Sequence, residues 1–182
     1  MDDLAPFSLP HPDHHPATTA ARLLDLEEHL HLKDGEARID WLIRNEPKCK
    51  GGRRVLGTAY MPMVQGELRD CFEWLLTSLL GRWPDFLIIV DREYWEESDA
   101  RGREILVYHE LLHCIQKVDQ YGTPRFDKQS GRPIWGLRGH DVEEFSATVR
   151  RYGSWNDDIK LFVAAARDGD LAQLRAQIDV LR

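Results

Sequence analysis

Two histidines four residues apart, His109 and His113 in the sequence HELLH, restrict the local fold of this chain more than any other feature. Side chains at this spacing project from one face when the backbone is helical. The surrounding sequence favours a helix, because Ser98 or Asp99 can cap its N-terminus and apolar residues continue to about Val118. The residues predicted to pack inward are Ile105, Leu106, Leu112 and Ile115. The sequence therefore predicts a helix that presents both imidazoles on the same side.

The two imidazoles and the carboxylate beside them have the chemistry of a catalytic zinc site. One zinc ion matches the span between His109 and His113 on a helix. Glu110 follows the first histidine, so its carboxylate can reach a metal-bound water without binding the metal itself. Zinc lowers the pKa of such a water toward about 7, and Glu110 can pass the proton to a leaving nitrogen. The motif thus predicts hydrolysis by a zinc-bound water.

A catalytic zinc site also needs a third protein ligand and an open fourth position. The segment GHDVEEF at 139–145 is rich in ligand chemistry. Its candidates are His140, Glu143, Glu144 and Asp141, and on a helix His140 would share a face with both glutamates. Those that do not bind the metal are candidates to orient the ligand imidazoles.

Apolar segments before the HELLH helix predict strands. Residues 37–44 alternate apolar and polar side chains and favour a strand, although Leu42 also permits a short helix. Residues 53–63 place β-branched and aromatic residues between glycine and proline. The run FLIIVD at 86–91 predicts a buried strand, and its edge is a candidate for pairing with an extended peptide. Residues 66–82 predict a helix with one broad apolar face that ends at Gly81.

The remaining segments set the domain organisation. Residues 1–18 carry four prolines without apolar periodicity and are predicted to be a flexible arm, followed by a single domain over 19–182. A helix is predicted at about 18–32, and residues 119–139, rich in glycine and proline, are predicted to form a long loop or an irregular hairpin. Further helices are predicted from about 139–141 through 153 and over 156–181, the latter weakened at Gly169.

Composition limits the class of protein and its partners. Of the 182 residues, 42% are hydrophobic and 30% are charged, as in soluble globular proteins. The net charge of −7 argues against nucleic-acid binding through a broad basic surface, and only the arginine pairs at 53–54 and 150–151 hint at a local one. No apolar run is long enough to span a membrane, and the three cysteines form no CxxC pair. These observations predict a cytoplasmic protein and leave its oligomeric state open.

The chain resembles the family called putative phage metallopeptidases, which is similar to the SprT-like and minigluzincin-type peptidases. The resemblance covers most of 37–150 and rests on IDWLIRNEPKCKGGRRVLG, FLIIVDREYW, YHELLHC and GHDVEEF. It implies a small α+β zincin-like domain, in which the active-site helix packs on a short mixed or antiparallel sheet, with additional C-terminal helices. It also implies a phage-encoded protein that works in the host cytoplasm.

The third zinc ligand follows from the same resemblance. In SprT-like proteins it is the histidine of a short HxxxF-like segment after a loop, which maps onto His140, with Phe145 packing beneath it. Here 26 residues separate His113 from His140, a longer gap than in SprT-like proteins. The resemblance therefore implies the ligand set His109, His113 and His140, with Glu143 or Glu144 as the fallback for the third position.

The sequence supports two functions of different classes. The first is a zinc metallopeptidase that cleaves a protein or peptide substrate. The alternative is a zinc-stabilised binding module that acts on a host protein or DNA without catalysis. Glu110 discriminates between them, because a structural zinc site does not need this carboxylate. Tyr108 and Tyr121 are further candidates to donate a hydrogen bond to a developing oxyanion.

Overall fold

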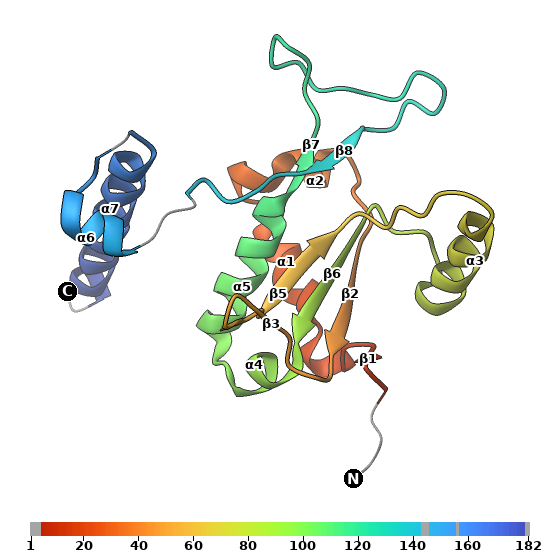
Figure 1. The fold of residues 1–182 in the computed structure, drawn as a ribbon, viewed down its shortest axis with the longest axis horizontal. Coiled ribbons are helices and arrows are strands. Elements are labelled where there is room, and N and C mark those ends of the chain that lie inside the picture. The colour runs from red at the N-terminus through yellow and green to blue at the C-terminus, as the bar shows by residue number, and fades with distance from the viewer. Residues whose placement is uncertain (1–4, 143–145, 156, 181–182) are drawn as a thin grey trace. The chain divides into compact units, whose positions relative to one another are not determined.

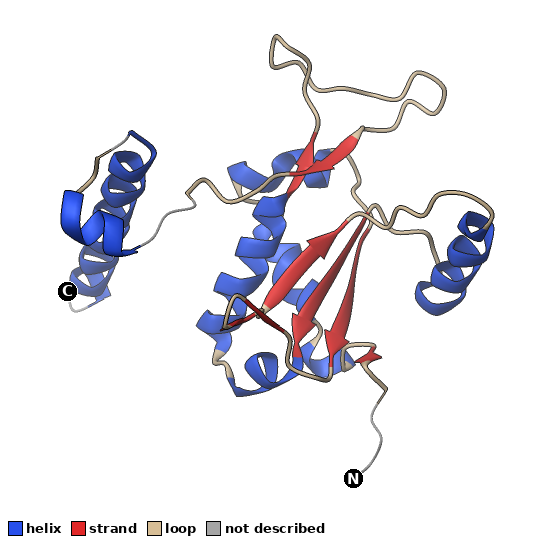
Figure 2. Ribbon diagram, viewed as in Figure 1, coloured by secondary structure: helices blue, strands red, loops and turns tan. Residues whose placement is uncertain are grey.

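The computed structural model describes residues 5–142, 146–155 and 157–180 (Figure 1). The chain forms two compact units, residues 1–138 and residues 139–182. The first contains the sheets and the helices around them, and the described part of the second contains two helices. Helices and strands together confirm the predicted α+β class (Figure 2).

The central sheet has four strands in the order β1, β2, β6, β5. Their bounds are Phe7–Ser8 for β1, Ile39–Arg44 for β2, Gly57–Tyr60 for β5 and Phe86–Asp91 for β6. β2 and β6 run parallel, whereas β1 and β5 pair antiparallel with their neighbours on either side. The sheet is therefore mixed, and the strands predicted at 37–44, 53–63 and 86–91 each contain one of its members.

β6 is an interior strand, as predicted for a buried strand, so its candidate role of pairing with an extended peptide is excluded. Its two edges pair with β2 and β5. Phe86, Ile88 and Val90 are fully buried, as a strand covered on both sides requires. β5 lies next to β6 at one edge of the sheet, and the residues of β5 contact the HELLH helix.

The HELLH helix is α5 (Ala100–His113), which packs against α1 (Pro16–Leu23) and β5. Its N-terminus is capped as predicted, because the Asp99 carboxylate accepts a hydrogen bond of 2.7 Å from the Gly102 N–H. Core residues of α5 are Leu106, Val107 and Leu111, which join side chains from β2 and β6. Ile105 was predicted to point inward but is 56% exposed. Shorter elements are η1 (Pro12–His14), η2 (Glu27–His29), α2 (Leu30–Asp34) and α4 (Arg92–Glu97).

α5 ends at His113, five residues before the predicted end at Val118. The next residue, Cys114, is extended and begins β7 (Cys114–Gln116), which pairs antiparallel with β8 (Trp135–Leu137). Cys114 pairs with Leu137, and its fully buried side chain lies in the core. Strand pairing at residues distant in sequence thus ends the helix where the apolar pattern alone would continue it.

The residues between β7 and β8 form a projecting hairpin, which is one of the two alternatives predicted for residues 119–139. Isolated bridges pair Val118 with Pro124 and Phe126 with Pro133. Asp119 and Asp127 fix the two turns, since each carboxylate accepts hydrogen bonds from backbone N–H groups that follow it. A second, smaller hairpin joins β3 (Cys49–Lys50) to β4 (Arg53–Arg54).

Residues 1–18 were predicted to be a flexible arm, but residues 5–18 contain β1, η1 and the start of α1. Residues 1–4 lie outside the described residues. β1 pairs with β2, and the Trp95 indole donates a hydrogen bond of 2.9 Å to the carbonyl of His14. Pro16 begins α1, where a missing N–H costs no helical hydrogen bond. Prolines that argued for an arm on sequence alone therefore also suit turns and a helix start.

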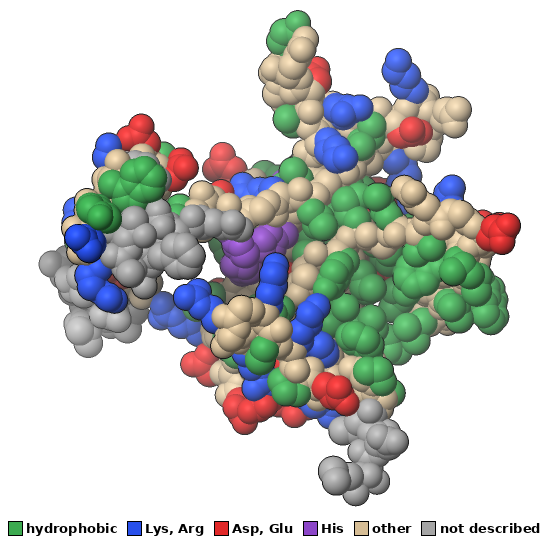
Figure 3. Space-filling model, in the orientation of Figure 1, with side chains coloured by type: hydrophobic (Ala, Val, Ile, Leu, Met, Phe, Trp, Pro, Cys, Tyr) green, Lys and Arg blue, Asp and Glu red, His purple; other side chains and the backbone are tan. Residues whose placement is uncertain are grey.

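The helices outside the core are α3 (Leu68–Leu80), α6 (Ser146–Tyr152) and α7 (Asp157–Val180). Most of the predicted apolar face of α3 is exposed, including Leu68, Leu75 and Leu79, and apolar side chains gather over this helix in Figure 3. Residues 139–142 are not helical, whereas a helix was predicted to begin there, and α7 continues through Gly169. No helix among the described residues is long and apolar enough to cross a membrane.

One buried histidine lies outside the HELLH motif. His29 is 0% exposed, and neither ring nitrogen has a hydrogen-bond partner in the described structure. Its ring packs edge-on against Tyr108, with the centroids 4.9 Å apart. Burial, and next the neighbouring His31, lower the pKa of His29 below 6.5, while Glu28 acts in the opposite direction. The fold therefore favours the neutral form of His29.

A neutral buried histidine makes stability depend on pH. The unfolded chain binds the proton more readily than the fold does, so the free energy of unfolding falls as pH drops below about 6.5. Between pH 7.5 and 5.5 we expect the free energy of unfolding of wild type to fall by more than that of His29→Leu. Urea denaturation at both pH values measures the difference, and equal losses in the two proteins would contradict the assignment.

Candidate metal centre

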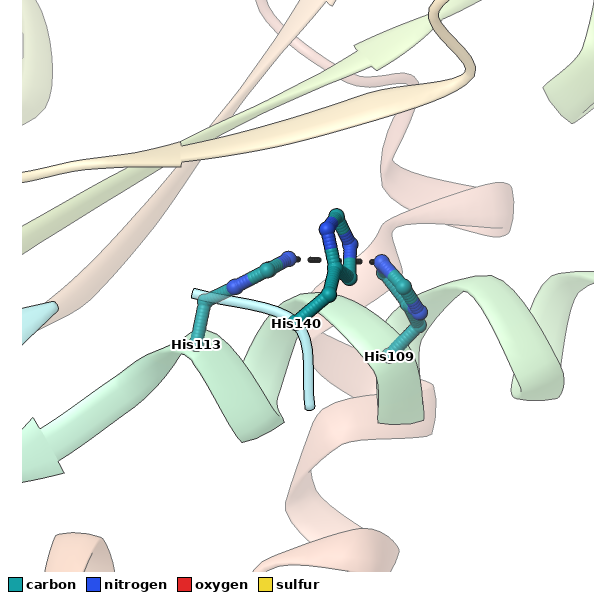
Figure 4. A group of neighbouring side chains, drawn as sticks. All are labelled: His109, His113 and His140. Carbon is teal, nitrogen blue, oxygen red and sulfur yellow. Dashed lines mark hydrogen bonds between the residues drawn. The ribbon is translucent and has the colours of Figure 1, made fainter. Parts of the chain in front are cut away.

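Three histidines meet beside the end of α5. His109 and His113 lie one turn apart on this helix, and His140 follows β8 by three residues. One ligand nitrogen from each of the three residues lies within 4.8 Å of the others (Figure 4). His109 and His140 are exposed and His113 is half-buried, and histidine side chains form a patch at the surface in Figure 3. A metal ion and a substrate can therefore both reach the three rings.

The β7–β8 ladder brings the segment of His140 back to α5. Beyond the pairing of Cys114 with Leu137, the Arg138 N–H donates a hydrogen bond of 3.0 Å to the carbonyl of His113. Arg138 is thus fixed at the end of the helix, and only one residue separates it from His140. Although 26 residues lie between His113 and His140, the backbone pairing makes them neighbours.

The ring of His113 is oriented by the same segment. Its Nδ1 lies 2.8 Å from the carbonyl oxygen of Arg138. A carbonyl can only accept, so Nδ1 carries the hydrogen, and in the neutral ring Nε2 keeps its lone pair. Metal-binding histidines have this arrangement, in which one nitrogen donates to a backbone carbonyl and the other binds the ion.

The nitrogen positions fit a tetrahedral ion. Zinc at about 2.0–2.1 Å from each nitrogen would separate two of its ligand nitrogens by about 3.3–3.4 Å. The Nε2 atoms of His109 and His113 lie 3.3 Å apart. Imidazole nitrogens are good ligands for zinc and also for copper, nickel and iron, so the donor set fits a metal of this group.

Glu110 follows His109 on α5, and its side chain is buried inside the protein. The residue is only 2% exposed, and its Oε2 has no hydrogen-bond partner among the described residues. Burial raises the pKa of Glu110 to about 7, although a hydrogen bond from the Ala59 backbone N–H acts in the opposite direction. The site therefore holds a carboxyl group with one unpaired oxygen and a pKa suited to proton transfer near neutral pH.

The first residue of β5 makes room for this carboxylate. A Cβ on Gly57 would lie 2.4 Å from Oε1 and 2.8 Å from Cδ of Glu110, which is closer than atoms can approach. Glycine is therefore required by the close approach of β5 to α5. Neither Gly57 nor the N–H of Ala59 was predicted as a site residue, although an isolated glycine within a strand pattern is a known sign of such an approach.

The other predicted candidates are distributed as follows. Asp141 is exposed and lies in a bend, and Glu143 and Glu144 lie outside the described residues. His140 is not helical, so the predicted shared helical face with the glutamates is wrong. Tyr121 is 83% exposed on the projecting hairpin. The ring of Tyr108 packs on His29, which accounts for its position without a catalytic role.

Comparison with known proteins gives one match. A family model described as "Putative phage metallopeptidase" matches residues 14–167. Searches of curated proteins and of solved structures found no match. The matched residues include the HELLH motif, β5 and His140, and hence every residue of the centre described above.

Proposed function

Because the chain belongs to the family of putative phage metallopeptidases, we propose that it is a zinc-dependent peptidase in which His109, His113 and His140 hold the metal and Glu110 is the general base. The observation that carries the proposal is a buried Glu110 oxygen without a hydrogen-bond partner among the described residues, next in sequence to one of the three clustered histidines. Nothing in a purely structural zinc site calls for a desolvated carboxylate next to its ligands. Burying a carboxylate without a partner costs free energy, and a catalytic role explains why the fold bears this cost, so the observation favours the enzyme over the binding module.

The chemistry divides between the metal and the protein. When bound, zinc would acidify a water molecule and polarise the peptide carbonyl. Glu110 Oε2, which has no hydrogen-bond partner among the residues that the structure describes, accepts the proton of the attacking water and delivers it to the leaving amine. The Ala59 N–H holds the other carboxylate oxygen, and Arg138 fixes the ring of His113 through its carbonyl. A cation at the histidines favours the ionised form of Glu110, which is the form that acts as a base.

Family membership supports a protein or peptide as the substrate. The family description also supports a phage origin, and with it the host cytoplasm as the place of action. Zinc is the metal that we propose, since a histidine triad with an open position is the usual catalytic site for this ion.

Metal content tests the proposal directly. We expect wild type to bind one zinc per chain and to cleave casein, with cleavage lost on chelation and restored by zinc. His109→Ala and His140→Ala should lose the zinc, because each removes one of three nitrogens. His11→Ala is the matched control, since His11 is exposed and outside the cluster.

Each outcome has a distinct meaning. Zinc retained by His140→Ala would move the third ligand to another residue, with Glu143 and Glu144 as the next candidates. A wild-type protein without zinc after metal-replete expression would overturn the proposed function. Zinc bound in stoichiometric amount without any Glu110-dependent cleavage would favour the binding module.

A further inference from the structure

A cavity opens directly beside the proposed catalytic residues. Its volume is about 300 Å³, and it lies where the segment leading into β5 meets α4 and α5. Apolar and aromatic side chains form most of its wall, namely Val55, Leu56, Tyr94, Ile105 and Leu106. Gly57 and two residues of α5, His109 and Glu110, complete the wall. The same two residues thus belong both to this cavity and to the metal centre.

We propose that this cavity binds one large aliphatic or aromatic side chain of the substrate, on a residue that forms the cleaved peptide bond. The inference rests on the proposed peptidase function and adds its substrate preference. Consecutive residues of an extended peptide are about 3.3–3.6 Å apart. A side chain held against His109 and Glu110 therefore belongs to a residue at the reacting bond and not to one farther along the peptide.

The size and chemistry of the cavity determine what it accepts. A volume of about 300 Å³ is at the lower end of the range for ligand pockets, which suits a single side chain. No lysine or arginine lines it, and an acidic side chain would meet the carboxylate of Glu110. A basic side chain would lose its hydration against apolar walls. Leucine, isoleucine, methionine and phenylalanine remain as the side chains that gain from burial there.

Ile105 is the position in this wall at which the cavity can be altered from the surface. It lies one turn before His109 on α5, so the two side chains share a face of the helix. The isoleucine is 56% exposed and lines the cavity. Because it is exposed, Ile105 can be replaced by a charged residue with little effect on folding.

The first experiment sequences the products of casein digestion by mass spectrometry. We expect one side of the cleaved bonds to carry leucine, isoleucine, methionine or phenylalanine. In synthetic peptides based on a cleaved site, leucine at that position should give kcat/KM at least about 10-fold higher than alanine. Ile105→Asp should reduce that ratio to near one while zinc is retained. Leu75→Asp, at an exposed leucine of α3 outside the cavity, is the matched control.

A second measurement does not depend on cleavage. Methyl-labelled protein is titrated with acetyl-leucinamide and, separately, with acetyl-alaninamide. We expect the methyl resonances of Leu56, Ile105 and Leu106 to shift with the leucine compound only. Cleavage that depends on Glu110 but shows no apolar preference, or resonances that stay unchanged, would overturn the cavity assignment and leave the proposed function intact. Cleavage independent of Glu110 would instead overturn the proposed function.

Discussion

Replacing Glu110 with glutamine is expected to lower kcat for peptide hydrolysis by about 10²- to 10⁴-fold, while the protein keeps its zinc. Glutamine fills the same space and retains an oxygen for the Ala59 N–H, but it cannot accept a proton from water. The loss should therefore fall on kcat with little change in KM. Steady-state kinetics on a cleaved peptide, together with zinc content, measure both effects.

A measurement of stability distinguishes a loss of catalysis in Glu110→Gln from misfolding of this variant. Burial raises the pKa of Glu110 to about 7 in the folded protein, so the fold binds this proton more tightly than the unfolded chain does. The stability that the protonated form provides is lost as pH rises toward 7, and above that the fold carries a buried charge. The metal-free glutamine variant should thus be more stable than metal-free wild type at pH 8. Glu104→Gln, at an exposed position of α5, is the control and should match wild type in activity.

Gly57→Ala is expected to lower kcat/KM by about 100-fold, because the new methyl group would occupy the place of the Glu110 carboxylate. The carboxylate must turn away from the Ala59 N–H, while the three histidines stay in place. Zinc content should therefore remain at the wild-type level as activity falls. Gly169→Ala is the control, since a Cβ there meets nothing within 4 Å. Full activity of Gly57→Ala would show that the carboxylate has another productive position.

Elements with a strong local pattern could be predicted from the sequence. The apolar run of β6, the alternation in β2 and the Asp99 cap of α5 each have a local cause, and the structure contains all three. No local pattern in the sequence marks the end of α5 at His113. Ile115 continues the helical pattern, but pairing between β7 and β8 draws the chain into a strand after His113. Contacts between residues distant in sequence decided these bounds.

The same distinction holds for the candidate site. His109, Glu110 and His113 follow from one motif on one helix, whereas His140 was chosen through a family resemblance. The structure brings the three histidines together, but their role as ligands stays a prediction. Gly57 and the N–H of Ala59 could not be predicted as partners of Glu110. Their role arises only from the packing of β5 against α5, which no local pattern encodes.

Because of the β7–β8 ladder, the positions of the three histidines do not depend on the length of the hairpin between His113 and His140. Pairing of Cys114 with Leu137 and of Gln116 with Trp135 closes the hairpin at its base, so residues in its tip can be added or removed there without moving Arg138. Related chains with quite different intervals between HELLH and the third histidine can therefore share one arrangement of imidazoles. A motif search with a fixed interval would overlook them, whereas one that requires a pair of strands between the two segments would not.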